Sequence, residues 1–166
     1  RRPAKNDRRN SGTGEIMLEE IYNYLQLSDI LHSGGMPTPE QVSSLAEDGI
    51  EVVVNLATPK SEAWMPDEQE RVEAQNITYY GIPVDWDNPT RNDLNKFTAL
   101  MDRHKGGKIL VHCQANYRAT VFIALYRYNF LGWTEENAFK DVREIWDPAE
   151  YPVWEKFIEK SLKAQS

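Results

Sequence analysis

The segment from Lys108 to Leu131 constrains the fold more than any other part of the chain. A short apolar stretch ends at Cys113, four residues follow, and a strongly apolar stretch begins at Arg118. The first stretch is typical of a buried strand and the second of a buried helix. The pattern therefore predicts a strand that passes through a tight loop directly into a helix.

Strand-like and helix-like segments also alternate along the rest of the chain. Thr38 and Gln41 have the spacing of a capping box, with Pro39 at the first helical position. Pro83 suggests an edge strand or a strand end. The alternation predicts an α/β fold with a central, mostly parallel sheet of four to five strands flanked by helices. Strands are expected over residues 51–56, 77–84 and 108–112, and helices from 38, over 67–75, from 90, over 118–131, 134–146 and about 153–162.

The tryptophans near the C-terminal end are expected to pack against the end of the domain rather than to bind a ligand. They are Trp133, Trp146 and Trp154. His104 is expected to be a surface residue at a helix end. Residues 32–35 could line the mouth of a pocket or form a plain turn, and the sequence leaves these two alternatives open.

Charge and length indicate one acidic domain. Of the 166 residues, 40% are hydrophobic and 27% are charged, and the net charge is -7. Residues 1–14 carry five basic residues and one acidic residue, so they are expected to be a disordered basic tail or the remnant of a tag. Residues 15–166 are expected to form a single domain. Their charge of about -11 opposes binding to nucleic acid.

The chain shows no apolar run long enough for a membrane span. A cytoplasmic location is expected, and a periplasmic one is possible if a signal peptide has been removed. The three histidines and the single cysteine show no spacing typical of metal ligands. No metal and no cofactor are therefore expected.

Cys113 stands at a position that changes how a lone cysteine is interpreted. Most such residues are small buried hydrophobes. Where a strand ends and a helix begins, however, unpaired N–H groups and the helix dipole converge. Such a place binds oxyanions and lowers the pKa of a thiol, so that a thiolate nucleophile is available at neutral pH. Arg118, in the first turn of the helix, offers a planar fork suited to two oxygens of a phosphate.

Two segments carry a resemblance to a known family. The stretch GGKILVHCQANYRAT resembles the signature loop of protein tyrosine and dual-specificity phosphatases. The stretch YYGIPVDWDNPTRNDLNKFTALMD is similar to the strand, general-acid loop and helix that precede this loop in the family. The chain looks most like small bacterial tyrosine-phosphatase-like proteins. This resemblance implies hydrolysis of a phosphomonoester through a phosphocysteine intermediate.

The resemblance also implies residue roles. Cys113 would attack phosphorus, Arg118 would hold the phosphoryl oxygens, and either Asp85 or Asp87 would act as the general acid. His112 would fix the loop from behind. The remaining predicted substrate-binding residues are those of the loop and the helix start, namely Gln114, Ala115, Asn116, Tyr117, Ala119 and Thr120. A phosphate or sulfate ion is expected in the loop, and the expected partner is a phosphoprotein or a small phosphomonoester.

The loop departs from the family pattern by one residue, because four residues rather than five separate Cys113 from Arg118. Aligned without a gap, the arginine position of the family falls on Ala119 and the hydroxyl position on Thr120. A one-residue gap restores Arg118 but places Ala119 at the hydroxyl position. The usual loop glycine is replaced by Asn116, which tolerates a left-handed backbone better than most residues.

Two alternatives to a phosphatase follow from the short loop. One is a catalytically weak or inactive module that binds phosphate on the same fold. The other is a rhodanese-like sulfurtransferase, because that family resembles this loop in length. The identity of the substrate and the oligomeric state are not predicted.

Overall fold

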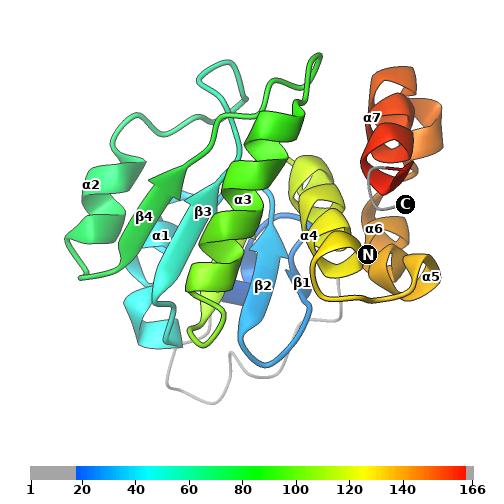
Figure 1. Cartoon of the computed structure of the whole chain (residues 1–166). Coiled ribbons are helices and arrows are strands. Elements are labelled where there is room, and N and C mark those ends of the chain that lie inside the picture. Colours follow the sequence, from blue (N-terminus) through cyan, green and yellow to red (C-terminus); the bar gives the residue numbers. More distant parts are fainter. Residues whose placement is uncertain (1–17, 164–166) are drawn as a thin grey trace.

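The computed structural model describes residues 18–163, and a five-stranded sheet lies at its centre (Figure 1). The strand order is β1-β2-β5-β3-β4, and only the pairing of β1 with β2 is antiparallel. The strands are β1 (Leu25–Gln26), β2 (Leu31–Gly34), β3 (Val52–Asn55), β4 (Thr78–Gly81) and β5 (Ile109–His112). The predicted α/β class with a mostly parallel sheet is confirmed. The predicted tail over residues 1–14 lies outside the described residues.

Helices cover both faces of this sheet (Figure 1). One face is covered by α1 (Pro39–Ser43) and α2 (Glu68–Glu73). The other is covered by α3 (Arg91–Arg103) and α4 (Tyr117–Asn129), and α4 is covered in turn by α5 (Glu135–Ala138), α6 (Lys140–Ile145) and α7 (Pro152–Lys163). Short 3₁₀ helices span Leu18–Glu20, Ala46–Asp48 and Pro148–Glu150.

Local signals fix where two of these helices begin. Thr38 accepts a hydrogen bond from the amide of Gln41, whose side chain accepts one from the amide of Thr38, as the capping box predicts. Thr90 and Asp93 form the same reciprocal pair at the start of α3. These caps satisfy N–H groups that have no partner within a helix. They also set the points at which the chain leaves the carboxyl ends of the strands.

The helix α4 lies in the middle of the larger core. Every residue from Arg118 to Arg127 is buried, so this helix has no solvent face over ten positions. Alternate residues of the parallel strands point to opposite faces of the sheet. Val53 and Leu110 therefore pack against α1 and α2, whereas Val54 and Val111 pack against α3 and α4. Burial on both faces explains the continuous apolar runs in β3 and β5.

Two details differ from the sequence prediction. The helix expected over residues 134–146 is broken at Phe139, whose ψ of 4° is not helical. Trp133 is 38% exposed, in contrast to the buried Trp146 and Trp154. It follows Gly132, which adopts a φ of +79° and turns the chain outward, and the guanidinium of Arg127 lies 4.1 Å from its ring. The packing predicted for Trp133 is therefore wrong.

His104 is at the C-terminal end of α3, as predicted, and its Nε2 lies 2.8 Å from the hydroxyl of Tyr80. His32 and Ser33 lie within β2 and are buried. Neither residue lines the cavity beside Cys113. The edge position predicted from Pro83 is confirmed, because β4 is the outermost strand on its side of the sheet.

Candidate active site

A four-residue loop joins the central strand β5 to α4. Its last residue, Asn116, adopts a φ of 70° and a ψ of 10°, which is the left-handed conformation. The family usually has a glycine at this position. Asparagine enters this region more readily than most other residues. The sharp turn at Asn116 lets the helix begin at Tyr117. Arg118 is consequently the second residue of α4.

The loop is held from behind by the segment around β2. The side-chain amide of Asn116 donates to the carbonyl of Asn23 at 2.8 Å and to Oγ of Ser33 at 3.0 Å. The amide of Asn23 donates in return to the carbonyl of Ala115 at 3.0 Å. The carbonyls of the loop thus point away from its concave side. Within residues 18–163, the backbone amides of Gln114 and Ala115 have no hydrogen-bond acceptor.

Gly35 allows this close support. The amide of Met36 donates to the carbonyl of Gln114 at 2.9 Å, and Gly35 lies beside the same carbonyl. A Cβ atom at position 35 would stand only 2.6 Å from the oxygen of Gln114. Any side chain here would therefore push the loop out of its present position.

A cavity of about 450 Å³ opens on the concave side of the loop. It brings together side chains from three distant parts of the sequence: the loop after β3, the loop after β4, and the segment after β5. The lining residues are Thr58, Lys60, Ser61, Asp85, Trp86, Asp87, Cys113, Gln114, Ala115, Tyr117 and Arg118. The four predicted catalytic residues therefore share one cavity.

Arg118 connects the loop to the segment that carries the aspartates. Its side chain is buried, and Nη1 donates to the backbone carbonyl of Val84 at 2.9 Å. Val84 immediately precedes Asp85. The contact uses one of the five N–H donors of the guanidinium, and the arginine still lines the cavity. The short loop thus keeps an arginine next to the cysteine.

Asp85 and Asp87 are both exposed at the rim of the cavity but differ in their contacts. Oδ1 of Asp85 accepts a hydrogen bond from the amide of Asp87 at 2.9 Å, which closes a local turn. Within residues 18–163, the carboxylate of Asp87 has neither a hydrogen bond nor an ion pair.

The comparison with known families agrees with this geometry. Residues 19–148 match the model of a family described as a DSP-PTPase phosphatase fused to NAD+ kinase. The chain belongs to this family. The match runs from the first described helix to the turn before α7, so it includes the cysteine loop and both aspartates.

Two similar proteins come from bacteria. A DUF442 protein of Shewanella putrefaciens CN-32, a candidate phosphatase, is 35% identical, and the alignment covers 88% of this chain and 92% of that one with a TM-score of 0.77. The dual-specificity phosphatase TpbA of Pseudomonas aeruginosa is 24% identical over 122 residues, or 73% of this chain. The chain spans about half (53%) of the length of TpbA. A TpbA structure in complex with pTyr has the same fold, with a TM-score of 0.65.

In this member of the phosphatase family, aromatic side chains form one wall of the cavity. Tyr117 stacks on Trp146, with ring centroids 4.4 Å apart and planes 11° apart, and Trp86 lies against both rings. Nε1 of Trp154 donates to the carbonyl of Trp86 at 2.8 Å, which fastens the aspartate loop to α7. Burial, followed by the nearby Tyr151, raises the pKa of Tyr117. Its hydroxyl is therefore neutral at physiological pH.

Several residues predicted to bind substrate do not face the cavity. His112, Asn116, Ala119 and Thr120 are buried behind the loop and are absent from its lining. The hydroxyl of Thr120 donates to the carbonyl of Asn116 at 2.8 Å and accepts from Nε1 of Trp146 at 3.1 Å, so it is fully used within the protein. The side chains of these residues support the loop, and only their backbone groups could reach a bound anion. Gln114, Ala115 and Tyr117 do line the cavity.

Thr58, Lys60 and Ser61 line the cavity but were not singled out in the sequence. They belong to the loop that follows β3, and no motif marks them. The rule that ligands bind beyond the carboxyl ends of parallel strands would have indicated this loop. Within the described part of the chain, no group of three histidine, cysteine or acidic residues could hold a metal ion. None of the described helices is both long and apolar enough to cross a membrane.

Proposed function

We propose that this chain hydrolyses a phosphomonoester through a phosphocysteine intermediate. The observation that carries the proposal is the convergence of Cys113, Arg118 and the two aspartates on one cavity, from segments that are far apart in the sequence. Membership of a phosphatase family supports it. A non-catalytic binding module would have no need for carboxylates opposite the cysteine.

The geometry supports a two-step displacement. The thiolate of Cys113 attacks phosphorus, the bond from phosphorus to the leaving oxygen breaks, and a carboxylic acid of the rim gives its proton to that oxygen. The resulting carboxylate then takes a proton from water, which attacks the phosphocysteine and releases inorganic phosphate. Arg118 and the unpaired loop amides would hold the remaining phosphoryl oxygens throughout.

Asp87 is the better candidate for the general acid. A group that donates a proton must be protonated when the substrate arrives. Oδ1 of Asp85 accepts a hydrogen bond from the amide of Asp87, which holds this side chain in the local turn. Asp87 has no such bond within the described residues, and its side chain is free to turn toward a leaving group.

The cavity is large enough for more than a phosphoryl group. Its walls include the rings of Trp86 and Tyr117, and Lys60 stands at the rim. This mixture of aromatic surface and one cation fits a phosphoprotein side chain or a small organic phosphate. The presence of pTyr in a TpbA structure agrees with a substrate of this kind.

The test is hydrolysis of an aryl phosphate between pH 5 and 8 by the wild type, Cys113→Ser and Arg118→Lys. Arg127→Lys serves as a matched control, because Arg127 lies on the same helix and is buried, but pairs with Asp141 at 2.8 Å outside the cavity. Turnover should vanish in Cys113→Ser, fall strongly in Arg118→Lys and persist in Arg127→Lys. An inactive wild type that still binds inorganic phosphate would overturn the proposal in favour of a binding module.

A further inference from the structure

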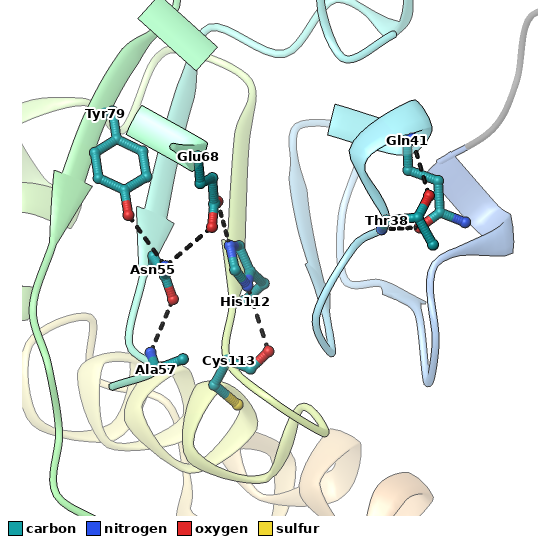
Figure 2. A network of polar contacts seen from close by, with 8 residues as sticks. All are labelled: Thr38, Gln41, Asn55, Ala57, Glu68, Tyr79, His112 and Cys113. Carbon is teal, nitrogen blue, oxygen red and sulfur yellow. Dashed lines mark hydrogen bonds and ion pairs between the residues drawn. The ribbon is translucent and has the colours of Figure 1, made fainter. Parts of the chain in front are cut away.

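A chain of buried polar side chains leads from α2 to the backbone of Cys113 (Figure 2). Nε2 of His112 lies 2.6 Å from Oε2 of Glu68, and the two side chains are 0% and 2% exposed. Nδ1 of His112 lies 3.3 Å from the carbonyl oxygen of Cys113. Figure 2 shows Glu68, His112 and Cys113 in succession, with the sulfur at the far end from Glu68. The carboxylate of α2 is thus linked to the backbone of Cys113 through one imidazole ring.

Asn55 extends this chain of contacts and shows which of its groups donate hydrogen bonds and which accept them. Its Oδ1 accepts a hydrogen bond from the backbone amide of Ala57 at 2.8 Å. This bond identifies the oxygen of the side-chain amide, so the other atom is Nδ2, which carries two hydrogens. These are donated to Oε1 of Glu68 at 3.1 Å and to the hydroxyl oxygen of Tyr79 at 3.0 Å. Glu68 therefore accepts from Asn55 at one oxygen and contacts His112 at the other. An amide nitrogen can only donate, so Oε1 of Glu68 is an acceptor in this chain.

The protonation of the ring follows from its partners. A carbonyl oxygen can only accept, so Nδ1 of His112 must carry a proton to bond with Cys113. If Glu68 is a carboxylate, the proton in the 2.6 Å contact belongs to Nε2. The ring then carries a proton on both nitrogens and a positive charge. Because the site is buried, this charge acts through a medium of low polarity and is felt strongly by its neighbours.

We propose that Glu68 is a positioning residue for the nucleophile: its carboxylate keeps His112 charged, and the charged ring stabilises the thiolate of Cys113. The inference rests on the proposed function, because it assigns Glu68 a part in activating the same cysteine. Among the residues that the structure describes, no other ionisable side chain shares a hydrogen bond with this imidazole. Of the titratable groups in the chain of contacts, Tyr79 on β4 remains neutral, because burial, and next the charge of Glu68, raises the pKa of Tyr79 to about 12.

A purely structural role for the same pair makes a different prediction. The contact could serve only to fasten α2 to the sheet, in which case its loss would weaken the fold without changing the thiol. A direct effect of the negative charge of Glu68 on the sulfur would even make the thiolate easier to form once that charge is removed. The proposal predicts the opposite direction, since replacing the carboxylate removes the positive charge from the nearer ring.

The experiment measures the rate at which iodoacetamide alkylates Cys113 between pH 5 and 9. Because the chain has one cysteine, the signal belongs to this residue alone. In the wild type, the rate should reach half of its maximum well below the value near 8.5 of a free thiol. In Glu68→Gln the midpoint should rise by about one pH unit, which lowers the rate at pH 6 by about tenfold. Tyr79→Phe, which alters the same chain of contacts beyond Asn55 without changing a formal charge, should leave the midpoint in place.

The outcomes separate the two proposals. A wild-type midpoint near 8.5 would overturn the proposed function itself. A low wild-type midpoint that Glu68→Gln leaves unchanged or lowers would overturn the role of Glu68 alone. Should Glu68→Gln fail to fold, ¹⁵N NMR of the wild type at pH 7 decides the question: two N–H signals from the ring of His112 support the proposal, and one contradicts it.

Discussion

The two sides of the cysteine loop are built in opposite ways. On the cavity side, Asp85 and Asp87 are exposed, and Asp87 has no hydrogen bond or ion pair within the described residues. On the far side, the carboxylate of Glu68 is 2% exposed, with a partner for each oxygen. The same chemical group is therefore left free where we propose that a proton moves, and it is fully bound where we propose that a charge stays.

This difference indicates how a short loop can have a fixed backbone and still leave room for a substrate. The far side holds the backbone through side chains such as Asn116, which bonds with Asn23 and Ser33. Groups held in this way need not reorganise when a substrate binds. The cavity side carries few fixed contacts, so substrate and leaving group can enter without breaking the structure. Substitutions on the cavity side should accordingly lower activity with little change in stability, whereas those on the far side should lower stability as well as the reactivity of Cys113.

The largest effect is expected on the cavity side. Asp87→Asn should lower kcat for an aryl phosphate by about 10²–10⁴-fold, because it removes the proton donor, with little change in the free energy of unfolding. Asp85→Asn is the matched variant, since asparagine can still accept the hydrogen bond that closes the turn. Its loss of activity should be much smaller. Steady-state kinetics of both variants at pH 6 decide the assignment, and the reverse order would make Asp85 the acid.

On the far side, the expected change is in stability. His112→Ala removes one partner of a buried pair and leaves the carboxylate of Glu68 without its 2.6 Å contact. Leaving such a charge unpaired typically costs about 3–5 kcal/mol. Urea unfolding at pH 7 should show this loss for His112→Ala and a smaller one for the double variant His112→Ala/Glu68→Gln. Equal losses in the two would mean that Glu68 carries no charge in the folded protein.

The sequence predicted the cavity side better than the far side, for a physical reason. Cys113 and Arg118 stand close together in one strand–loop–helix segment, so their meeting follows from local geometry. Glu68 meets His112 across 44 positions of the chain, and the contact depends on how α2 lies on the sheet. A glutamate in the first turn of a helix usually indicates a solvent-exposed position.

A helix start and an outward turn of the chain show the same contrast between local and long-range signals. The capping box of Thr38 is encoded within four residues and was predicted correctly. The outward turn at Gly132, which exposes Trp133, depends on the position of α5 against α4 and was not predicted. The fold could therefore be predicted from short-range patterns, whereas the burial of particular polar side chains depends on long-range packing.

Acid should weaken the fold through a second buried histidine, His32. Burial, and next the charge of Lys108, lowers the pKa of His32 to about 4, against about 6.5 in an unfolded chain. Between these values the unfolded chain binds a proton that the folded one does not, so stability falls as the pH falls through this range. From pH 7 to pH 5 the loss due to His32 should be about 2 kcal/mol.

The measurement compares urea unfolding of the wild type and His32→Gln at pH 7 and pH 5. Glutamine can still bond with the hydroxyl of Tyr24, which lies 2.7 Å from Nδ1 of His32. The variant should lack the part of the acid sensitivity that belongs to this group. A parallel loss in both proteins would assign the acid sensitivity to other residues.

The smallest effect tests the turn on which the short loop depends. Asn116→Gly and Asn116→Ala both lose the bonds to Asn23 and Ser33, but only alanine has to pay for a φ of 70°. The free energy of unfolding in urea should therefore be about 1–2 kcal/mol lower for Asn116→Ala than for Asn116→Gly. Equal stabilities would show that the loop leaves the left-handed conformation when the side chain is lost. The far side of the loop would then be held by the contacts of Asn116 rather than by its backbone, and Arg118 would keep its place only while those contacts last.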